Sequence, residues 1–330
     1  MNQVSPQPIL SLARNFMESR ILLTGAELNL FTLLAPTPLS AQEVAGRIGG
    51  DWRALSILLD GLAAMDFLVK EEGKYQCPSS VSPFLSDHGP RSILPMVLHM
   101  AHLWRRWSGL TDVVQGLKAE EKPSASMRNP DALRSFIGAM HVIATPLASR
   151  IVAAVNPGAS KFLLDVGGAL GTYVLAFLQA SPEMKATLFD RPEVIAMARQ
   201  RLGKEGVLDR VTLAPGDFYK DELPSGHDLA FVSAIIHQNS PAQNLDLFAK
   251  VFRSLTSGSR IVIRDHIMAP DRTSPKDGAV FAVNMLMATA GGGTYTYDEI
   301  KEGLNQTGFI SVRLLQQGER MDGLVEGFKP

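Results

Sequence analysis

The chain has 330 residues, 45% of them apolar and 20% charged, so it can bury a substantial core in one large or two medium domains. Its 32 basic and 33 acidic residues nearly balance, which argues against nucleic acid as a partner. The single cysteine, Cys77, excludes an intramolecular disulfide and a multi-cysteine metal site, and it fits a reducing compartment. The sequence shows neither a signal-like start nor a run of about 18 uncharged apolar residues, so we expect a cytoplasmic protein that does not contact a membrane.

Residues 1–90 are expected to form a helical, winged-helix-like domain. After an amphipathic first helix, Ser40 and Glu43 form a capping box that begins a short second helix. A third helix with one apolar face covers residues 52–65, and two short strands follow in residues 67–77. The order of helices followed by a ribbon is that of a winged helix.

Winged helices often bind DNA, and the charge of this region argues against that role. Residues 1–85 hold six basic and eight acidic side chains, whereas a phosphate-binding face needs an excess of Lys and Arg. We therefore expect this domain to contact protein. A ligand-sensing winged-helix regulator would need a basic recognition helix, which residues 52–65 do not supply, so that function is a remote alternative.

Residues 91–154 are expected to be mainly helical and to link the two domains. Aromatic and methionine side chains gather in residues 94–107 and 136–144, and a loop is predicted at the Pro and Ser residues of 123–130. Two histidines in the first of these segments have helical spacing, but no third ligand is near in the sequence, so we expect no metal.

Residues 155–330 alternate strands and helices. The expected strands cover 161–166, 186–190, 211–214, 228–236, 260–265, 309–315 and 323–328. The expected helices cover 172–180, 192–202 (closed by Gly203), 241–255 and a segment capped by Thr296 and Glu299. Strands that are apolar on both faces and separated by helices predict a parallel sheet covered on both sides. The fold class is therefore α/β, with a Rossmann-like, doubly wound domain.

The first of these strands runs into a glycine-rich loop, from Asp165 to Gly171. Gly167, Gly168 and Gly171 let the backbone turn tightly and approach a ligand beyond the carboxyl ends of the strands. Asp190 ends the next strand, where an acid can accept hydrogen bonds from both hydroxyls of a ribose. These residues by themselves indicate a nucleoside.

A dinucleotide is the competing ligand, but its fingerprint G-x-G-x-x-G differs from the G-G-x-x-G of this loop. Asp165 would also repel a pyrophosphate, whereas it would hold the ammonium and balance the sulfonium of S-adenosylmethionine. After the third strand, Asp217 suits the adenine amino group and Phe218 suits the face of the base. With Ser233, near the end of the fourth strand, these residues complete the expected S-adenosylmethionine site.

Two further polar residues are expected at the same edge of the sheet. His237 follows the fourth strand, and Asp265 ends the next one. A hydroxyl that attacks a methyl carbon must lose its proton, and an imidazole of pKa about 6.5 can take it from a phenol of pKa about 10. We interpret His237 as the general base and Asp265 as the carboxylate that orients it. A strand-end histidine with no catalytic role is the alternative.

The segments LLDVGGALG, LFDRPEV, GDFY, IIHQNS and IRDHIMAP resemble, in this order, the plant caffeate-type and hydroxyindole-type O-methyltransferases and their bacterial relatives. The resemblance extends over nearly the whole chain. It implies S-adenosylmethionine as cofactor, a small aromatic or polyketide-like hydroxyl acceptor, and a homodimer joined through the N-terminal domain. It also implies that helices within residues 95–145 line the acceptor pocket, and that Trp104, Met140 and Met285 face the acceptor.

Several positions depart from that family. Ala169 replaces the middle glycine of the loop, and Gln238 and Asn239 replace an Asp-Trp pair after the base. Asp265 is one methylene shorter than the family's Glu, and Thr294 stands where plant members have a second Glu. Methylation of carbon, or a hydroxylation or pericyclic reaction without methyl transfer, is therefore an alternative for an enzyme on this scaffold.

Overall fold

A computed structural model describes residues 5–117 and 130–330 of the chain. The polypeptide forms two compact units, each of which is assembled from two stretches of sequence. The first unit consists of Met1–Ser108 and Ala125–Val142, and the second of Gly109–Ser124 and Ile143–Pro330, as far as these residues are described.

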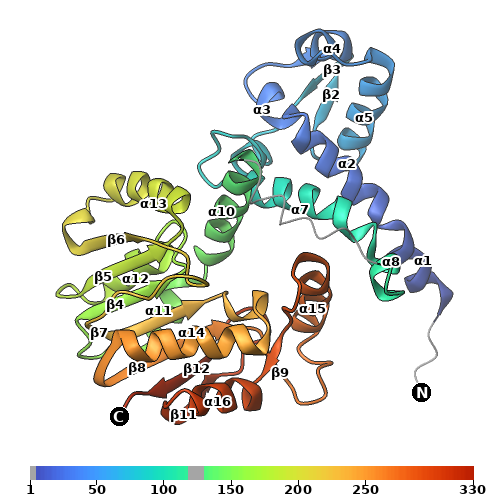
Figure 1. Ribbon diagram of the computed structural model, residues 1–330. Helices are drawn as coiled ribbons and strands as arrows, with labels where there is room; N and C mark the ends of the chain where they lie inside the picture. The colour runs from blue at the N-terminus through green and yellow to red at the C-terminus, as the bar shows by residue number, and fades with distance from the viewer. Residues whose placement is uncertain (1–4, 118–129) are drawn as a thin grey trace. The chain divides into compact units, whose positions relative to one another are not determined.

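The first unit is mainly helical and contains one small sheet (Figure 1). Its helices are α1 (Pro6–Arg14), α2 (Phe16–Glu27), α3 (Leu30–Leu34), α4 (Ala41–Ile48), α5 (Trp52–Ala64), α6 (Ser82–Leu85), α7 (Leu94–Trp107) and most of α10 (Pro130–Ala144). Its strands are β1 (Leu39–Ser40), β2 (Val69–Glu71) and β3 (Lys74–Gln76). They form an antiparallel sheet in the order β1-β3-β2.

Local signals in the sequence begin and end these elements. The Glu43 N–H donates to Ser40 Oγ, and the Ser40 N–H donates to the Glu43 carboxylate at 2.7 Å, which confirms the predicted capping box. Asp51 caps α5 through its side chain. Glu72 and Gly73 connect β2 and β3 with φ values of 48° and 77°, as a two-residue hairpin turn requires.

The predicted loop at residues 123–130 lies outside the described residues, except that Pro130 begins α10. The following helix, α11 (Ala148–Val155), buries Ile151, Val152 and Val155 in the core of the second unit. No single helix in the described residues is long and apolar enough to cross a membrane. Only α10 and α11 taken together, with a bend of 63° between them, meet that criterion by length and composition.

The second unit is built around a seven-stranded sheet (Figure 1). The sheet strands are β4 (Phe162–Val166), β5 (Lys185–Asp190), β6 (Val211–Pro215), β7 (His227–Ser233), β8 (Leu255–Asp265), β11 (Ile310–Gln316) and β12 (Gly323–Phe328). The remaining elements are α8 (Leu110–Val114), α12 (Thr172–Ala180), α13 (Pro192–Lys204), η1 (Leu208–Arg210), η2 (Ile236–Gln238), α14 (Pro241–Ser254), β9 (Ile267–Met268), α15 (Lys276–Ala288), β10 (Tyr295–Thr296) and α16 (Tyr297–Gln306).

The strand order is β11-β12-β8-β7-β4-β5-β6, and all neighbours are parallel except β12, which is antiparallel to both of its neighbours. The chain adds β5 and β6 on one side of β4 and then β7 and β8 on the other. The winding therefore reverses between β4 and β7, which is where such sheets bind ligands beyond the carboxyl ends of the strands. The predicted Rossmann-like sheet is confirmed.

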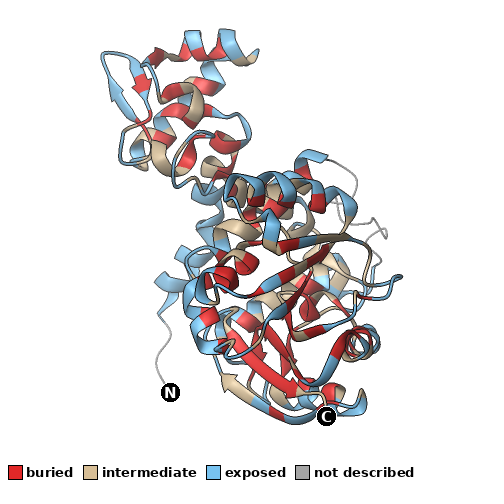
Figure 2. Ribbon diagram, turned by 90° about the vertical axis from the view of Figure 1, so that its left-hand side faces the viewer, coloured by how far each residue is buried: buried red, intermediate tan, exposed pale blue. Residues whose placement is uncertain are grey.

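The central strands of this sheet, among them β4, β7 and β12, are buried on both faces (Figure 2). Alternate residues of each strand contribute to two apolar clusters. One cluster holds Leu163, Phe231 and Val262 and includes side chains of α11, α12 and α13. The other holds Leu164 and Val232 and includes side chains of α14 and α16. Buried polar residues also occur in these strands: Asp165 and Asp265 lie near strand ends, and Glu326 lies within β12.

Several boundary predictions were wrong. The largest difference is in β8, which was expected over residues 260–265 and begins at Leu255. The fourth strand, expected over residues 228–236, ends at Ser233, because Ala234 adopts a left-handed conformation with φ 59° and turns the chain into η2. Its last apolar residues are buried in that turn rather than in the sheet. The helix expected to close at Gly203 continues to Lys204, because Gly203 can remain helical.

We expect Glu326→Gln to destabilise the second unit strongly. Glu326 lies fully buried in β12, where it accepts hydrogen bonds from Arg260 at 2.7 Å and from Arg313. The amide would leave both guanidinium groups without their carboxylate, at a cost of about 3 kcal/mol in the free energy of unfolding measured with urea. Glu222→Gln is the matched control, because its ion pair with Arg253 is more than half exposed, and it should change far less. An equal loss in the two variants would contradict this account.

Candidate active site

The glycine loop connects β4 to α12 with a backbone that side chains would obstruct. Gly167 and Gly171 have φ values of 70° and 72°, and Gly171 is the residue before the first turn of α12. A Cβ on Gly167 would lie 2.4 Å from Ile235 Cδ1, and a Cβ on Gly168 would lie 2.7 Å from Asp165 Oδ2. The loop therefore packs directly against the buried carboxylate and against the segment that follows β7.

Ala169 keeps the left-handed conformation that the replaced glycine would adopt freely. Its φ is 48°, which costs an alanine about 1 kcal/mol. Its N–H donates to Asp190 Oδ2 at 2.9 Å, so the loop backbone holds that carboxylate in place. The Arg191 N–H donates to the other oxygen at 2.7 Å. Burial raises the pKa of Asp190, and these two hydrogen bonds oppose the increase.

Asp165 lies beneath the glycine loop and is only 1% exposed. Burial, followed by the negative charge of Asp190, raises the pKa of its carboxyl to about 7. Its Oδ2 atom has no hydrogen-bond partner among the residues that the structure describes. A buried carboxylate oxygen without a donor is costly. This atom therefore fits an ammonium group, as the cofactor predicted from the sequence would provide.

Asp217 and Phe218 lie at the end of β6, in the same row of strand ends. Asp217 is partly exposed and accepts a hydrogen bond from the Tyr219 N–H at 3.0 Å. The ring of Phe218 lies about 4.0 Å from the position of a Cβ on Gly167, so it borders the glycine loop. Ser233, at the end of β7, accepts a hydrogen bond from Arg264 at 2.9 Å.

His237 and Asp265 form a buried pair at this edge. His237 Nδ1 lies 2.9 Å from both carboxylate oxygens of Asp265, and Asp265 is 1% exposed. Burial alone would raise the pKa of Asp265, but the charge and hydrogen bond of His237 and the His266 N–H outweigh it, so the pKa lies below its usual value. An ionised Asp265 selects the tautomer with the proton on Nδ1, which leaves the Nε2 lone pair free to accept a proton.

A buried amide network holds the turn that carries His237, and sequence reasoning missed it. Asn239 is fully buried and accepts a hydrogen bond from the Tyr219 hydroxyl at 2.6 Å. It donates to Asn244, which in turn donates to the Ile236 carbonyl at 3.0 Å. These hydrogen bonds also connect the turn to the loop after Phe218. Only the position of Asn239, two residues after the predicted base, could have signalled this role.

The expected acceptor residues divide between the two units. Met285 is buried on α15, a helix whose Phe281 packs its ring edge-on against His237 with centroids 4.8 Å apart. Trp104 and Met140 belong to the first unit, where Trp104 packs against Phe16. The second unit therefore brings together the predicted catalytic and cofactor residues with Met285, and the roles of Trp104 and Met140 stay predictions.

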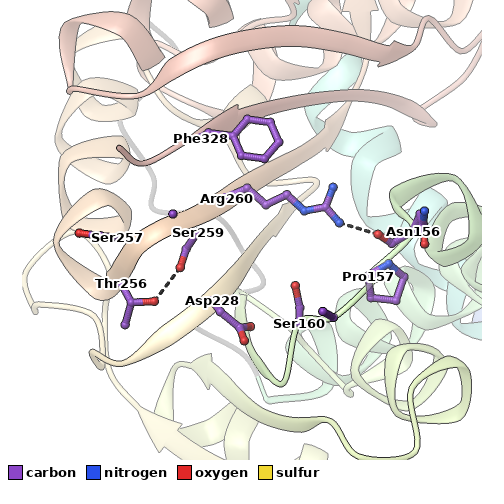
Figure 3. A pocket seen from close by; sticks show the side chains of 12 residues that line it. Asn156, Pro157, Ser160, Asp228, Thr256, Ser257, Ser259, Arg260 and Phe328 are labelled. Atoms are coloured by element: carbon purple, nitrogen blue, oxygen red, sulfur yellow. Dashed lines mark hydrogen bonds between the residues drawn. The ribbon is translucent and has the colours of Figure 1, made fainter.

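A cavity lies at the opposite ends of the strands (Figure 3). It has a volume of about 470 Å³ and is bordered by Ser160, Asp228, Thr256, Arg260 and other residues. Asp228 accepts hydrogen bonds from the Lys161 and Phe162 N–H groups, so its carboxylate is already occupied by backbone donors. We therefore place the site at the glycine loop rather than in this cavity.

Comparison with known proteins identifies the family of the chain. Residues 107–310 match the model of an O-methyltransferase domain, and residues 10–82 match that of an O-methyltransferase dimerisation domain. The chain is 31% identical to the tetracenomycin polyketide synthesis 8-O-methyl transferase of Streptomyces glaucescens, over 93% of this chain and 92% of that protein. It is 28% identical to the 3-hydroxy-5-methyl-1-naphthoate 3-O-methyltransferase of Streptomyces sahachiroi, over 98% and 95% of the two chains.

Solved structures share the fold over the full length. PigF with SAH superposes with a TM-score of 0.88 at 23% identity, covering 99% of this chain and 100% of that one. Human N-acetylserotonin methyltransferase in complex with SAM superposes with a TM-score of 0.83 at 24% identity, covering 100% and 99%.

The raised pKa of Asp165 predicts a pH dependence for cofactor binding. Only the ionised carboxylate pairs with an ammonium, so the Kd of S-adenosylhomocysteine should rise toward tenfold per pH unit below pH about 7 and level off above it, up to the pH at which the ligand's amino group loses its proton. Calorimetry over this range measures the effect. Asp165→Asn should bind more weakly and lose the pH dependence, whereas Asp217→Asn should keep it. An unchanged pH profile in Asp165→Asn would rule out this assignment.

Proposed function

The chain belongs to the S-adenosylmethionine-dependent O-methyltransferases that carry a dimerisation domain, and on that premise we propose that it methylates a hydroxyl of a small aromatic or polyketide-like molecule, with His237 as general base. The observation that carries this proposal is the pairing of His237 Nδ1 with both oxygens of the buried Asp265. Asp265 ends β8 and His237 follows β7 at the same edge as the glycine loop, where a base can reach an acceptor placed beside a methyl donor.

We assign the cofactor to the residues of that edge. When bound, S-adenosylmethionine supplies a methyl group on a positively charged sulfur. In this proposal Asp165 accepts from the ammonium and Asp190 from the ribose hydroxyls. The unpartnered Oδ2 of Asp165 supports the fit, and Gly167 and Gly168 allow the loop backbone to pack closely around that carboxylate and Ile235. Phe218 packs on the adenine.

His237 takes the proton of the acceptor hydroxyl as the hydroxyl oxygen attacks. Its Nδ1–H donates to Asp265, so the lone pair of Nε2 is the one available to the substrate. The ionised Asp265 then stabilises the imidazolium that forms. A positioned base of this kind contributes about 10²- to 10⁴-fold to the rate. A reaction without proton removal would give this buried pair no comparable role.

Apolar groups beside the base favour a flat, aromatic acceptor. Phe281 stands edge-on to His237, and Met285 lies one turn further along α15. Two relatives are named for a naphthoate and for tetracenomycin polyketide synthesis, and an acceptor of this chemical class fits such side chains. We further propose that residues 91–154 complete the acceptor site with Trp104 and Met140.

The proposed assembly is a homodimer joined through residues 1–90, with residues 155–330 as the catalytic domain. The match to a dimerisation domain supports it. A row of large apolar side chains on α1 and α2 is more than half exposed in the single chain, namely Ile9, Leu12, Phe16 and Met17. Apolar surface of this kind is typical of a contact between subunits.

The role of His237 predicts a separation of catalysis from cofactor binding. His237→Ala should lower kcat for a phenolic acceptor by at least about 100-fold, because no base takes the proton. Transfer of a labelled methyl group across a panel of phenols, naphthols and hydroxyanthraquinones measures this loss. Calorimetry should give a Kd for S-adenosylhomocysteine close to that of the wild type. His88→Ala, a change of an exposed histidine, is the control. A kcat in His237→Ala equal to that of the control would refute the base assignment.

The dimer proposal predicts the mass of two chains in light scattering. Leu12→Asp combined with Met17→Asp should give monomers, because charge in the apolar row opposes burial. Circular dichroism should show unchanged helix content. Leu208→Asp places a charge on an exposed apolar residue of the second unit and should leave the dimer intact. A dimer that persists in the double variant would place the interface elsewhere.

A further inference from the structure

Arg264 is a buried arginine. Among the described residues, no acidic side chain lies within ion-pair distance of its guanidinium. Arg264 precedes Asp265 at the end of β8 and is 2% exposed. One terminal nitrogen donates to Ser233 Oγ at 2.9 Å, and the guanidinium lies 5.2 Å from the centre of the Tyr173 ring. Nε and the other terminal nitrogen have no hydrogen-bond partner among the described residues. Unpaired buried donors of a charged group are expensive, so they indicate a ligand.

Two more unpartnered polar atoms lie in the same part of the sheet. The hydroxyl of Tyr173, in the first turn of α12, and Oδ2 of Asp165 also have no partner among the described residues. Strand register places Asp165, Ser233 and Arg264 on one face of neighbouring strands, because Asp165 pairs with Phe231 and Ser233 pairs with Arg264. The Tyr173 ring packs on Phe231 on this face, 5.0 Å away.

The unpartnered groups at the two ends of this row of residues, Asp165 and Arg264, carry opposite charges. Asp165 offers a negatively charged acceptor next to Gly168. Arg264 and Tyr173 offer donors, one of them positively charged. Burial raises the pKa of the Tyr173 hydroxyl, and the charges of Arg264 and Asp165 and the hydroxyl of Ser233 also act on it, so these groups border one region. A ligand with an ammonium and a carboxylate on one carbon matches this arrangement.

We propose that Arg264, assisted by Tyr173, binds the carboxylate at the amino-acid end of the cofactor, while Asp165 binds its ammonium. The inference rests on the cofactor of the family and adds a specificity-determining residue that selects for the carboxylate. Arg264 and Asp265 are consecutive, so their side chains leave β8 on opposite faces. The end of β8 thereby supplies both the residue that binds the cofactor carboxylate and the residue that orients the base.

The test compares two ligands that differ only in this group. S-Adenosylhomocysteine carries both the ammonium and the carboxylate, and its decarboxylated analogue keeps the ammonium alone. In calorimetry the wild-type chain should bind the first about 10- to 100-fold more tightly, the range expected for hydrogen bonds to a charged group. Arg264→Met, which keeps the length and loses the charge, should bind the two ligands about equally.

Two further variants keep the test decisive. Asp165→Asn should weaken both ligands and leave their ratio unchanged, because both carry the ammonium. Tyr173→Phe should reduce the ratio only several-fold, and it serves as the readout if Arg264→Met does not fold. Wild-type preference retained by a folded Arg264→Met, or equal binding of the two ligands by the wild type, would overturn the inference. Failure of the wild type to bind S-adenosylhomocysteine would instead contradict the cofactor site as a whole.

Discussion

The parallel pairing of β7 with β8 is the constraint on which the site depends. Ser233 pairs with Arg264, and the next N–H, that of Ala234, donates to the Arg264 carbonyl at 2.8 Å. The left-handed turn at Ala234 then brings His237 to Asp265 at the end of the neighbouring strand. A shift of one residue would send the side chains of 264 and 265 to the wrong faces, so strand register decides both functions.

Buried polar groups, rather than cavity size, mark the functional edge of this sheet. The carboxylate of Asp265 is stable as an ion because His237 and a backbone N–H satisfy it. Asp165 and Arg264 lack comparable partners among the described residues. Burying such charged groups is costly, and the proposed cofactor, which would pair with both, explains why they lie near the glycine loop and α12. In the cavity at the amino ends of the strands, Asp228 is already bonded to backbone N–H groups.

The sequence alone predicted those features that depend on local spacing. Apolar strands between helices implied a parallel sheet, and Asp165, Asp190 and His237 at strand ends then had to share an edge. The end of β7 was predicted three residues too late, because only packing decides that Ala234 turns left-handed. The partners of Asn239 come from distant segments, and periodicity carries no information about such contacts. In the sequence, Arg264 is one polar residue in an apolar strand, and only its neighbours in the fold show that its guanidinium is partly unpaired.

The central claim is that His237 removes the acceptor proton during methyl transfer. The most direct test is the transfer rate for a series of substituted phenols, compared between the wild type and His237→Ala. The claim predicts a large loss for phenols of pKa about 10 and a small one for phenols already ionised at the assay pH, which need no base. A loss of equal size across the series would contradict it, because a residue that only positions the acceptor would act without regard to phenol pKa.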